Sequence, residues 1–447
     1  MKKWISILIV GLIVIIVFII ARPKLSENYY QKALAYSDSS KYELAIKNYT
    51  KAIKFGKKNT QALLGRANAY YQQEQLDLSK KDFDAILVLD VQNYDAYLGR
   101  ALYHIKKEEW ENALNDLTAA QQLHSENPEI YYFMGYSESN QGEKESALKH
   151  LNKAIELDSL YAEAYHHRGI VKANLGDLEG SVKDFNRSIE LDKENLDAYQ
   201  RRVKYRINKD DFKGAIADYD AIINLDENNQ DAYFQRGYFK LRIQDFEGAI
   251  SDFNKSLEIN SNHMLSYKKR GNANAALGEF EDAIKDFNQA LALDNSDSET
   301  YYSKGMVYMN LSDIVNANKM FNKSISLKKD YDKAYYMRGV TMAMQQKYTE
   351  SISDFDLAIK YNKDNYDAYL GKAISLGMLE RHTEALKSYD IYLNHVKDNG
   401  SAYLNRGISR INAQNTQGGC EDFQKALELG VEQAKGMLNM YCKSNTN

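Results

Sequence analysis

A single period of 34 residues runs through most of the chain and restricts the folds open to it. Residues 26–433 divide into twelve successive units of 34 residues, with no insertion between them. The fourth position of the unit is Tyr in eleven of the twelve, and Leu63 is the exception. The eighth position is Gly or Ala in every unit except the sixth, which has Val203. Repetition at this distance indicates an array of small structural repeats rather than one globular domain.

The pattern inside each unit predicts two helices. Positions 4, 8 and 11 share one face of a first helix, and positions 20, 24 and 27 share one face of a second. Position 20 is always small and position 24 is always large and apolar. A polar break near positions 14–18 separates the helices and often contains Gly, as at Gly142, Gly176 and Gly278. Small residues at positions 8 and 20 would let the helix axes approach, and the side chain at position 24 would fill the remaining space. Each unit is therefore predicted to be a helical hairpin.

One such hairpin buries too little apolar surface to offset the entropy lost when its 34 residues become ordered. We therefore expect the units to stack on their neighbours around one continuous core.

This pattern resembles the tetratricopeptide repeat family, and the resemblance covers residues 26–433. It implies an all-α fold: a right-handed α-solenoid superhelix of about twelve helix-turn-helix units with a C-terminal capping helix. It also implies a non-catalytic scaffold that binds other proteins. The Pro that the family usually has at position 32 is missing, and other residues replace it, as at Lys57, Ser159, Lys193 and Asn295.

A paired substitution pattern links positions 7 and 23. Position 7 is Arg in eight units, and position 23 of the same eight units is always Asp. In the other four units position 7 is Lys or Met, and position 23 is never Asp. We predict an Arg–Asp ion pair between the two helices of each hairpin, and we favour it over a ladder of Arg side chains for anionic ligands. The eight pairs are Arg66–Asp82, Arg100–Asp116, Arg168–Asp184, Arg202–Asp218, Arg236–Asp252, Arg270–Asp286, Arg338–Asp354 and Arg406–Asp422.

Residues 1–24 differ from the repeats. Lys2 and Lys3 precede an uncharged apolar run that ends at Ala21 and is long enough to cross a bilayer as a helix. We expect a single-pass N-terminal membrane anchor, because a cleaved signal peptide would have smaller residues before the cut than Ile19 and no Pro23 after it. The basic leader favours a repeat domain outside the cytoplasm, on the periplasmic side.

In superhelices of this family, first-helix positions line the concave surface, and the corresponding residues are the candidate peptide-binding groove. An acidic segment or a C-terminal carboxylate is the expected ligand for their basic members. Further along the chain the same positions hold Tyr302, Met306, Tyr336 and Met337. A carboxylate clamp of the kind that some family members have is matched only at Lys268, Asn272 and Lys333, and an ordinary solvated surface remains the alternative. The candidates are Tyr132, Phe133, Tyr136, His166, His167, Arg201, Lys204, Phe234, Tyr238, Lys268, Lys269 and Asn272.

Several other functions find no support in the sequence. The 58 basic and 62 acidic residues leave no excess of positive charge for nucleic acid. We find no phosphate-binding Gly loop and no hydrolase or zinc-protease motif, so neither catalysis nor a small-molecule substrate is expected. His166 and His167 are adjacent and diverge by about 100° on a helix, which disfavours a shared metal ion. No cofactor is expected.

The only two cysteines lie near the C-terminus. Gly430 suits a helix end, and a capping helix is expected from Val431 to Cys442, with residues 434–447 forming its remainder and a polar tail. In an antiparallel hairpin Cys420 and Cys442 would lie at similar heights, which makes a disulfide plausible in an oxidising compartment, with two buried thiols as the alternative.

The sequence thus predicts a membrane-tethered scaffold that holds peptide segments or protein subunits in a concave groove. A recruiting subunit of an envelope enzyme or secretion system, and a self-assembling structural protein, are the alternatives.

Overall fold

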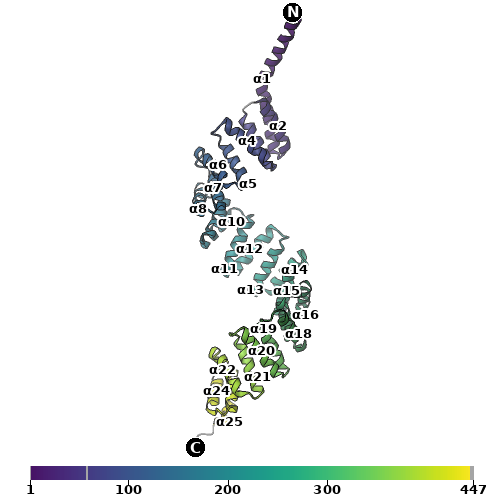
Figure 1. The fold of residues 1–447 in the computed structure, drawn as a ribbon, viewed down its shortest axis with the longest axis vertical. Coiled ribbons are helices and arrows are strands. Elements are labelled where there is room, and N and C mark those ends of the chain that lie inside the picture. The colour runs from purple at the N-terminus through teal and green to yellow at the C-terminus, as the bar shows by residue number, and fades with distance from the viewer. Residues whose placement is uncertain (1, 57–58, 443–447) are drawn as a thin grey trace. The chain divides into compact units, whose positions relative to one another are not determined.

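The computed structural model of the chain describes residues 2–56 and 59–442, without the side chains of residues 2–7, 13, 14 and 17–19. This part of the chain is all-α: it contains twenty-five helices and no strand (Figure 1).

The helices alternate between the first and second members of hairpins. The first helices are α1 (Lys2–Asp38), α3 (Thr60–Gln72), α5 (Tyr94–Lys106), α7 (Pro128–Gln141), α9 (Ala162–Asn174), α11 (Leu196–Asn208), α13 (Gln230–Arg242), α15 (Met264–Leu277), α17 (Ser298–Asn310), α19 (Asp332–Met344), α21 (Tyr366–Met378) and α23 (Gly400–Asn412). The second helices are α2 (Tyr42–Phe55), α4 (Leu76–Leu89), α6 (Trp110–Leu123), α8 (Lys144–Leu157), α10 (Leu178–Leu191), α12 (Phe212–Leu225), α14 (Phe246–Ile259), α16 (Phe280–Leu293), α18 (Ile314–Leu327), α20 (Tyr348–Tyr361), α22 (His382–His395) and α24 (Thr416–Glu428), and α25 (Gln433–Tyr441) follows them.

The chain forms two compact units, Met1–Asp211 and Phe212–Asn447. Within each unit every helix packs on the next one in the chain, and several neighbouring first helices also touch, as α7 touches α9 and α19 touches α21. Packing between chain neighbours is the defining property of a solenoid, because each repeat completes the core of the next. The predicted stacking of helical hairpins is confirmed.

The side chain at position 24 fills the space between the helices, as predicted. A Cβ atom built on Gly305 would lie 2.6 Å from the Phe321 ring, so only Gly leaves room for that ring. The following repeat closes the other side: a Cβ on Gly371 would lie 2.5 Å from the Phe355 ring. A Cβ on Gly339 would lie 2.9 Å from the same Phe355 ring, so this ring is wedged between its own first helix and the next one, which joins the two repeats into one core.

The turn between the two helices of a hairpin depends on a left-handed residue at position 15. All twelve repeats have a positive φ there, between 55° and 91°. Only Gly142, Gly176 and Gly278 are glycines at this position; the other nine are polar residues such as Glu108 and Glu380. Side chains rarely adopt this conformation, which costs about 1–2 kcal/mol per non-glycine residue.

Helix capping fixes the turn between repeats at eight of the eleven junctions, whereas Tyr161, His263 and Tyr331 at the other three give no side-chain cap. An Asn or Asp at position 34 accepts a hydrogen bond from a backbone N–H in the first turn of the following helix. Such a cap contributes about 1 kcal/mol and sets where the helix begins. It thus restricts the turn in place of the Pro that the family usually has at position 32. The capping residues are Asn59, Asn93, Asn127, Asn195, Asn229, Asp297, Asn365 and Asn399.

The predicted Arg–Asp pairing is confirmed for all seven pairs that lie within one unit. Each guanidinium donates two hydrogen bonds to its Asp, with N···O distances of 2.5–3.0 Å. The Asp side chains are buried. The third nitrogen, Nη1, donates to a polar side chain at position 25 of the preceding repeat, as Arg270 does to Asn254 at 2.5 Å. The Arg therefore links three helices, and its role is structural.

The fourth repeat replaces this pair in a different way. It has Met134 and His150 at positions 7 and 23, and His150 Nδ1 lies 2.7 Å from a carboxylate oxygen of Glu138 at position 11. The polar link between the two helices is thus kept, although the first helix supplies its partner, Glu138, one turn after position 7.

The predicted single-pass membrane anchor is wrong for the part of the chain that the structure describes. No helix there combines the length and the apolar character that crossing a membrane requires. α1 runs without a break from Lys2 through Pro23 to Asp38, so the segment predicted as an anchor continues directly into the first repeat. Several side chains of that segment lie outside the described residues. The periplasmic location, which depended on the anchor, loses its basis.

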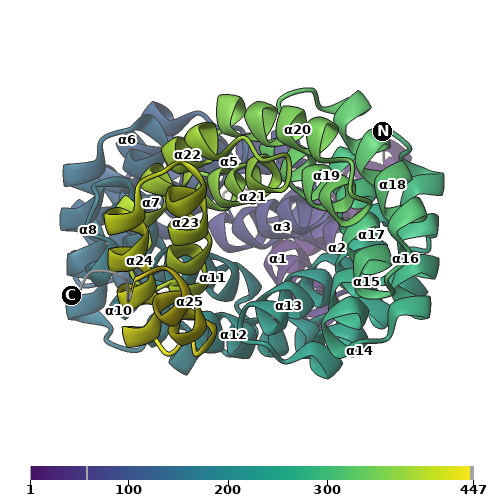
Figure 2. The ribbon, with the colours of Figure 1, turned by 90° about the horizontal axis from the view of Figure 1, so that it is seen from below.

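Cys420 and Cys442 form a disulfide, with Cα atoms 5.8 Å apart. It joins α24 to the end of α25, and the two helices lie against each other at the C-terminal end (Figure 2). Met437, Leu438 and Val431 pack on the buried cluster around Phe423. α25 thus covers the apolar side of the hairpin formed by α23 and α24.

Candidate functional site

The predicted groove residues of the first unit gather into an aromatic cluster on α7 and α9. Tyr132 lies 5.0 Å from Phe133, 5.0 Å from Tyr161 and 5.3 Å from His167, as measured between ring centroids. The His167 ring also meets Tyr136 edge-on at 4.9 Å. Burial raises the pKa of the Tyr132 hydroxyl above its usual value. The rings therefore pack mainly against each other.

The two adjacent histidines have separate environments. His166 is buried, and its Nε2 lies 2.7 Å from the Asp197 carboxylate, which also accepts a hydrogen bond from Arg201 at 2.5 Å. Burial, followed by the neighbouring His166, lowers the pKa of His167 to about 4, so His167 is neutral at pH 7. Among the described side chains no group of three His, Cys, Asp or Glu could hold a metal ion. Of the predicted residues here, Lys204 is exposed and Arg201 is partly exposed.

In the second unit the predicted basic residues are not equally accessible. Lys268 is 5% exposed and pairs with Asp297 at 2.9 Å and with Glu299. Its charge is therefore already compensated, and it does not serve a carboxylate clamp. Phe234 is also buried, with its ring 4.9 Å from that of His263.

Three predicted residues of the second unit remain partly exposed: Tyr238, Lys269 and Asn272. The Lys269 ammonium lies 5.4 Å from the centre of the Tyr238 ring, which is a cation–π contact between neighbouring first helices.

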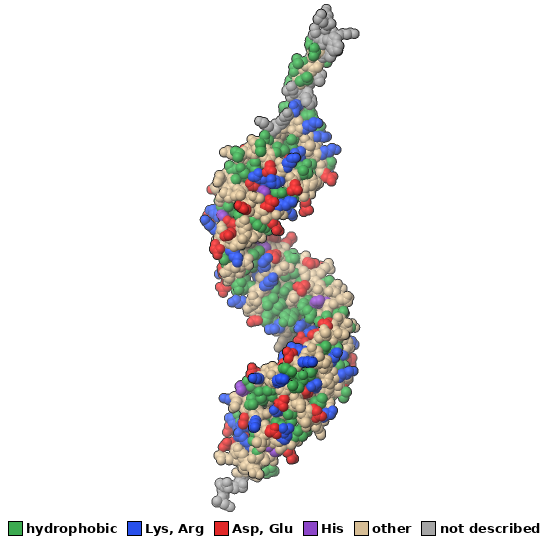
Figure 3. Space-filling view, viewed as in Figure 1, with side chains coloured by type: hydrophobic (Ala, Val, Ile, Leu, Met, Phe, Trp, Pro, Cys, Tyr) green, Lys and Arg blue, Asp and Glu red, His purple; other side chains and the backbone are tan. Residues whose placement is uncertain are grey.

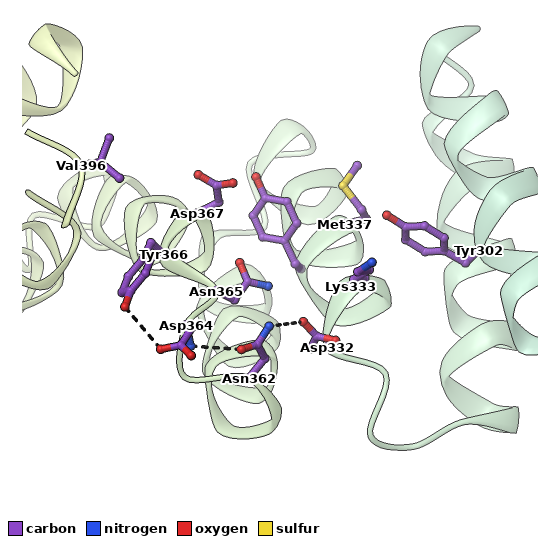
Figure 4. A pocket seen from close by; sticks show the side chains of 11 residues that line it. Tyr302, Asp332, Lys333, Met337, Asn362, Asp364, Asn365, Tyr366, Asp367 and Val396 are labelled. Carbon is purple, nitrogen blue, oxygen red and sulfur yellow. Dashed lines mark hydrogen bonds between the residues drawn. The ribbon is translucent and has the colours of Figure 1, made fainter. Parts of the chain in front are cut away.

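A pocket lies further along the second unit, on α17, α19 and α21. It has a volume of about 450 Å³. Its aromatic walls are Tyr302, Tyr336 and Tyr366, and Met337 adds an apolar side chain (Figure 4). The other lining residues are Asp332, Lys333, Asn362, Asp364, Asn365, Asp367 and Val396.

A chain of hydrogen bonds holds the polar side of this pocket in place (Figure 4). The Tyr366 hydroxyl donates to Asp364 at 3.3 Å, the Asp364 backbone N–H donates to Asn362 at 3.1 Å, and the Asn362 amide donates to Asp332 at 3.0 Å. The turn between α20 and α21 is thereby joined to the start of α19. The Asp332 and Asp364 carboxylates are thus oriented before any ligand binds, which lowers the entropic cost of binding.

Negative charge around the pocket influences its tyrosines. Burial, followed by the Asp367 carboxylate, raises the pKa of Tyr336, and burial followed by Asp332 raises the pKa of Tyr302. Both hydroxyls therefore stay protonated at pH 7 and can donate hydrogen bonds to a ligand.

A second, apolar pocket of about 250 Å³ adjoins the first and shares Tyr336 and Asp367 with it. Its walls come from α19 and α21 and from Phe355 of α20. Met344 and Ile374 on its rim are 58% and 40% exposed. The apolar lining residues are Val340, Ala343, Met344, Phe355, Leu370, Gly371 and Ile374.

The candidate groove residues lie on α7 to α15, whereas these two pockets lie on the later first helices α17, α19 and α21. Tyr302, Tyr336 and Met337 occupy predicted groove positions, although they are not among the twelve candidate residues. The missed signal was a run of apolar residues at positions 5, 9 and 13: Val340, Met344, Leu370, Ile374 and Met378. The loop residues Asn362 and Asp364 could not be found in this way, because they lie outside the first helices.

Stacked helical hairpins, each completing its neighbour's core, define an α-helical repeat protein of the solenoid class. Family profiles described as "Tetratricopeptide repeat" match residues 30–95, 64–128, 128–159, 162–195, 230–263, 298–331 and 336–403. A profile described as "TPR repeat" matches residues 271–312. Together they span well over half of the chain, so it belongs to the tetratricopeptide repeat family. Such repeats typically form non-catalytic scaffolds for protein–protein interaction.

No curated protein sequence matches the chain. Among solved structures, it is similar to the Cut9–Hcn1 hetero-tetramer of the APC/C, with a TM-score of 0.44 and 13% identity over 94% of this chain and 96% of that one. It is also similar to yeast Tom70, with a TM-score of 0.38 and 15% identity over 93% and 94%. YrrB, described as a TPR protein with an unusual peptide-binding site, gives 0.38 and 20% over 42% and 97%. All three TM-scores lie below 0.5.

Proposed function

We propose that this protein is a scaffold that binds an extended peptide segment of another protein along the first helices of its second unit. The observation that carries the proposal is the pair of adjoining pockets on α17, α19 and α21. Together they offer about 700 Å³ for side chains of a bound segment.

The composition of the two pockets suits peptide recognition. Aromatic and Met side chains provide large contact areas, and residues of this kind are enriched where binding energy concentrates at protein interfaces. The Asn and Asp side chains can pair with backbone N–H groups of an extended chain, which has no internal partners for them. The predicted groove residues Tyr238, Lys269 and Asn272 lie on α13 and α15, first helices of the same unit. They extend the proposed surface toward α13.

The first unit has fewer side chains available for a ligand than the second. Its aromatic cluster is largely self-packed, and the acidic partner of His166 and Arg201 is already in place. We propose that Tyr136, Arg201 and Lys204 form a secondary contact region there. The face seen in Figure 3 carries Lys, Arg, Asp and Glu side chains interspersed over both units, which suits specific contacts better than bulk attraction of a polyanion.

Capture of peptides by the full-length chain tests this function. The chain is immobilised and incubated with a random library of soluble nonapeptides, and the retained peptides are identified by mass spectrometry. Tyr336→Ala removes the ring shared by the two pockets. Tyr361→Ala is the matched control, because it removes an exposed ring from α20 that neither pocket contains.

We expect the control to retain the same peptides as the original chain and Tyr336→Ala to lose them. Thermal melting of both variants checks that the repeats remain folded. Equal retention by both variants, or no retention by the original chain, would contradict a peptide-binding groove at this position.

A further inference from the structure

We infer that the segment bound by the second unit carries an apolar side chain close to a Lys or Arg side chain. This inference rests on the proposed peptide-binding function and names the chemistry of its ligand. It differs from the prediction for the basic residues of α9 to α15, which is an acidic ligand.

The charges that line the larger pocket provide the first reason. Three carboxylates line it, those of Asp332, Asp364 and Asp367, against the single ammonium of Lys333. The groups that accompany two of the carboxylates are neutral: Asn362 donates to Asp332, and Tyr366 donates to Asp364. These hydrogen bonds orient the carboxylates but leave their charges uncompensated, so a cationic side chain is the complementary ligand.

The aromatic walls provide the second reason. Tyr302, Tyr336 and Tyr366 line the same pocket as the carboxylates, and ring faces attract Lys and Arg side chains through cation–π contacts. The chain already uses this contact: the Lys328 ammonium lies 5.0 Å from the ring centre of Tyr331, which in turn packs 5.3 Å from Tyr302. A pocket that combines ring faces with carboxylates favours a guanidinium or an ammonium over an anion.

The adjoining apolar pocket provides the third reason and sets the spacing. Val340, Met344, Leu370 and Ile374 line it, and its only charged lining residue is Asp367, at the border with the larger pocket. An aliphatic or aromatic side chain placed there loses contact with water without burying a polar group. An extended peptide advances about 3.3 Å per residue, so neighbouring pockets select side chains that are a few residues apart.

Two carboxylates also lie in the first turns of their helices, Asp332 in α19 and Asp367 in α21. There the positive end of the helix dipole stabilises a negative charge. That role explains one acidic residue in each helix. It does not explain why Asp364, from the turn before α21, lines the same space and is fixed there by Tyr366 and Asn362.

The test uses the nonapeptide library and the full-length chain. We expect the retained peptides to be enriched in Lys or Arg within three positions of Leu, Ile, Met, Val or Phe. The variant carries Asp332→Asn and Asp367→Asn, which remove two negative charges and keep the side-chain shapes. The matched control carries Glu247→Gln and Glu281→Gln, which remove two exposed charges from α14 and α16, outside the pockets.

One retained peptide, labelled with fluorescein, is then titrated against the three proteins. An exposed ion pair contributes about 1.5-fold to fivefold in affinity, so losing two is expected to weaken binding about twofold to 25-fold. The control should change affinity by less than twofold. Raising the salt concentration should weaken binding to the original chain more than binding to the Asn variant.

The outcomes separate this inference from the proposed function. Retention of acidic or purely polar peptides, or equal affinity of the Asn variant and the control, would overturn the inference and leave peptide binding intact. Retention of no peptide would overturn both. Circular dichroism melting of each variant verifies that an affinity change does not come from unfolding.

Discussion

The Arg–Asp pairs allow the strongest quantitative test of how the repeats are held together. In the eighth repeat, Arg270 donates two hydrogen bonds to Asp286 at 3.0 and 2.6 Å and a third to Asn254 of the preceding repeat. Breaking a fully buried ion pair by removing one partner costs about 3–5 kcal/mol, because a charge is left without compensation. The Asp286 side chain is 6% exposed and that of Arg270 is 23% exposed, so water partly screens the cation.

We therefore expect Arg270→Met to destabilise the eighth repeat by about 2–4 kcal/mol. Asn274, which donates to Asp286 at 3.0 Å, limits the loss. Arg270→Met combined with Asp286→Met should lie within about 1 kcal/mol of the original chain, because apolar replacements of a buried pair are often neutral. The ninth repeat supplies a natural precedent, since Met320 occupies the position of the Asp there.

Native-state hydrogen exchange of the full-length chain is the suitable assay, because long repeat arrays do not always unfold in one step. Amide protection in α15 and α16 reports on the eighth repeat, and protection in α3 and α4 serves as an internal reference. A double variant as unstable as Arg270→Met would show that the cost does not come from an uncompensated carboxylate, and would refute this account of the pairs.

Three further predictions concern pH, the C-terminal cap and the turns. The pKa of His167 is lowered in the fold to about 4, below its value of about 6.5 in the unfolded chain, so its contribution to stability is complete above pH 6.5 and is lost as the pH falls toward 4. The loss amounts to about 3 kcal/mol, and His167→Gln should flatten the pH dependence of hydrogen exchange in α7 and α9. Reducing the disulfide, whose cysteines are 22 residues apart, should weaken the docking of α25 by up to about 3 kcal/mol, seen as faster exchange there in dithiothreitol; unchanged exchange would contradict this. Glu380→Gly, at φ 58°, should raise the melting temperature by relieving about 1 kcal/mol of backbone strain, whereas Gly142→Ala, at φ 91°, should lower it.

The repeat core was predictable from the sequence because its determinants recur. The positions of Gly305 and Phe321 keep a fixed spacing in every repeat, with a small residue at the first in nearly all of them and a large apolar one at the second, so their contact can be inferred from the pattern alone. The Arg–Asp pairs were predictable because Arg and Asp disappear together in the four exceptional repeats. The additional contact to position 25 was not predicted, because Asn, Asp and Thr share that position and no single residue type marks it.

The binding surface was less predictable, since it depends on features that do not repeat. Lys268 occupies a groove position, yet it is buried beneath Asp297 and Glu299. Whether a basic side chain is available depends on residues at the junction with the next repeat, and these vary. The predicted anchor was wrong because it was judged from apolar composition alone. Composition does not show that the segment before Pro23 and the first helix of the first repeat form one continuous helix, α1.

Photo-crosslinking tests the central claim, peptide binding between α17 and α21, most directly. A photoreactive phenylalanine analogue replaces Met337, inside the larger pocket, or Glu350, exposed on α20 of the same repeat. Each full-length protein is irradiated with a retained nonapeptide, and the crosslinked product is quantified by mass spectrometry. The account predicts a crosslink from position 337 and none above background from position 350. Equal crosslinking from both positions, or crosslinking from position 350 alone, would contradict it.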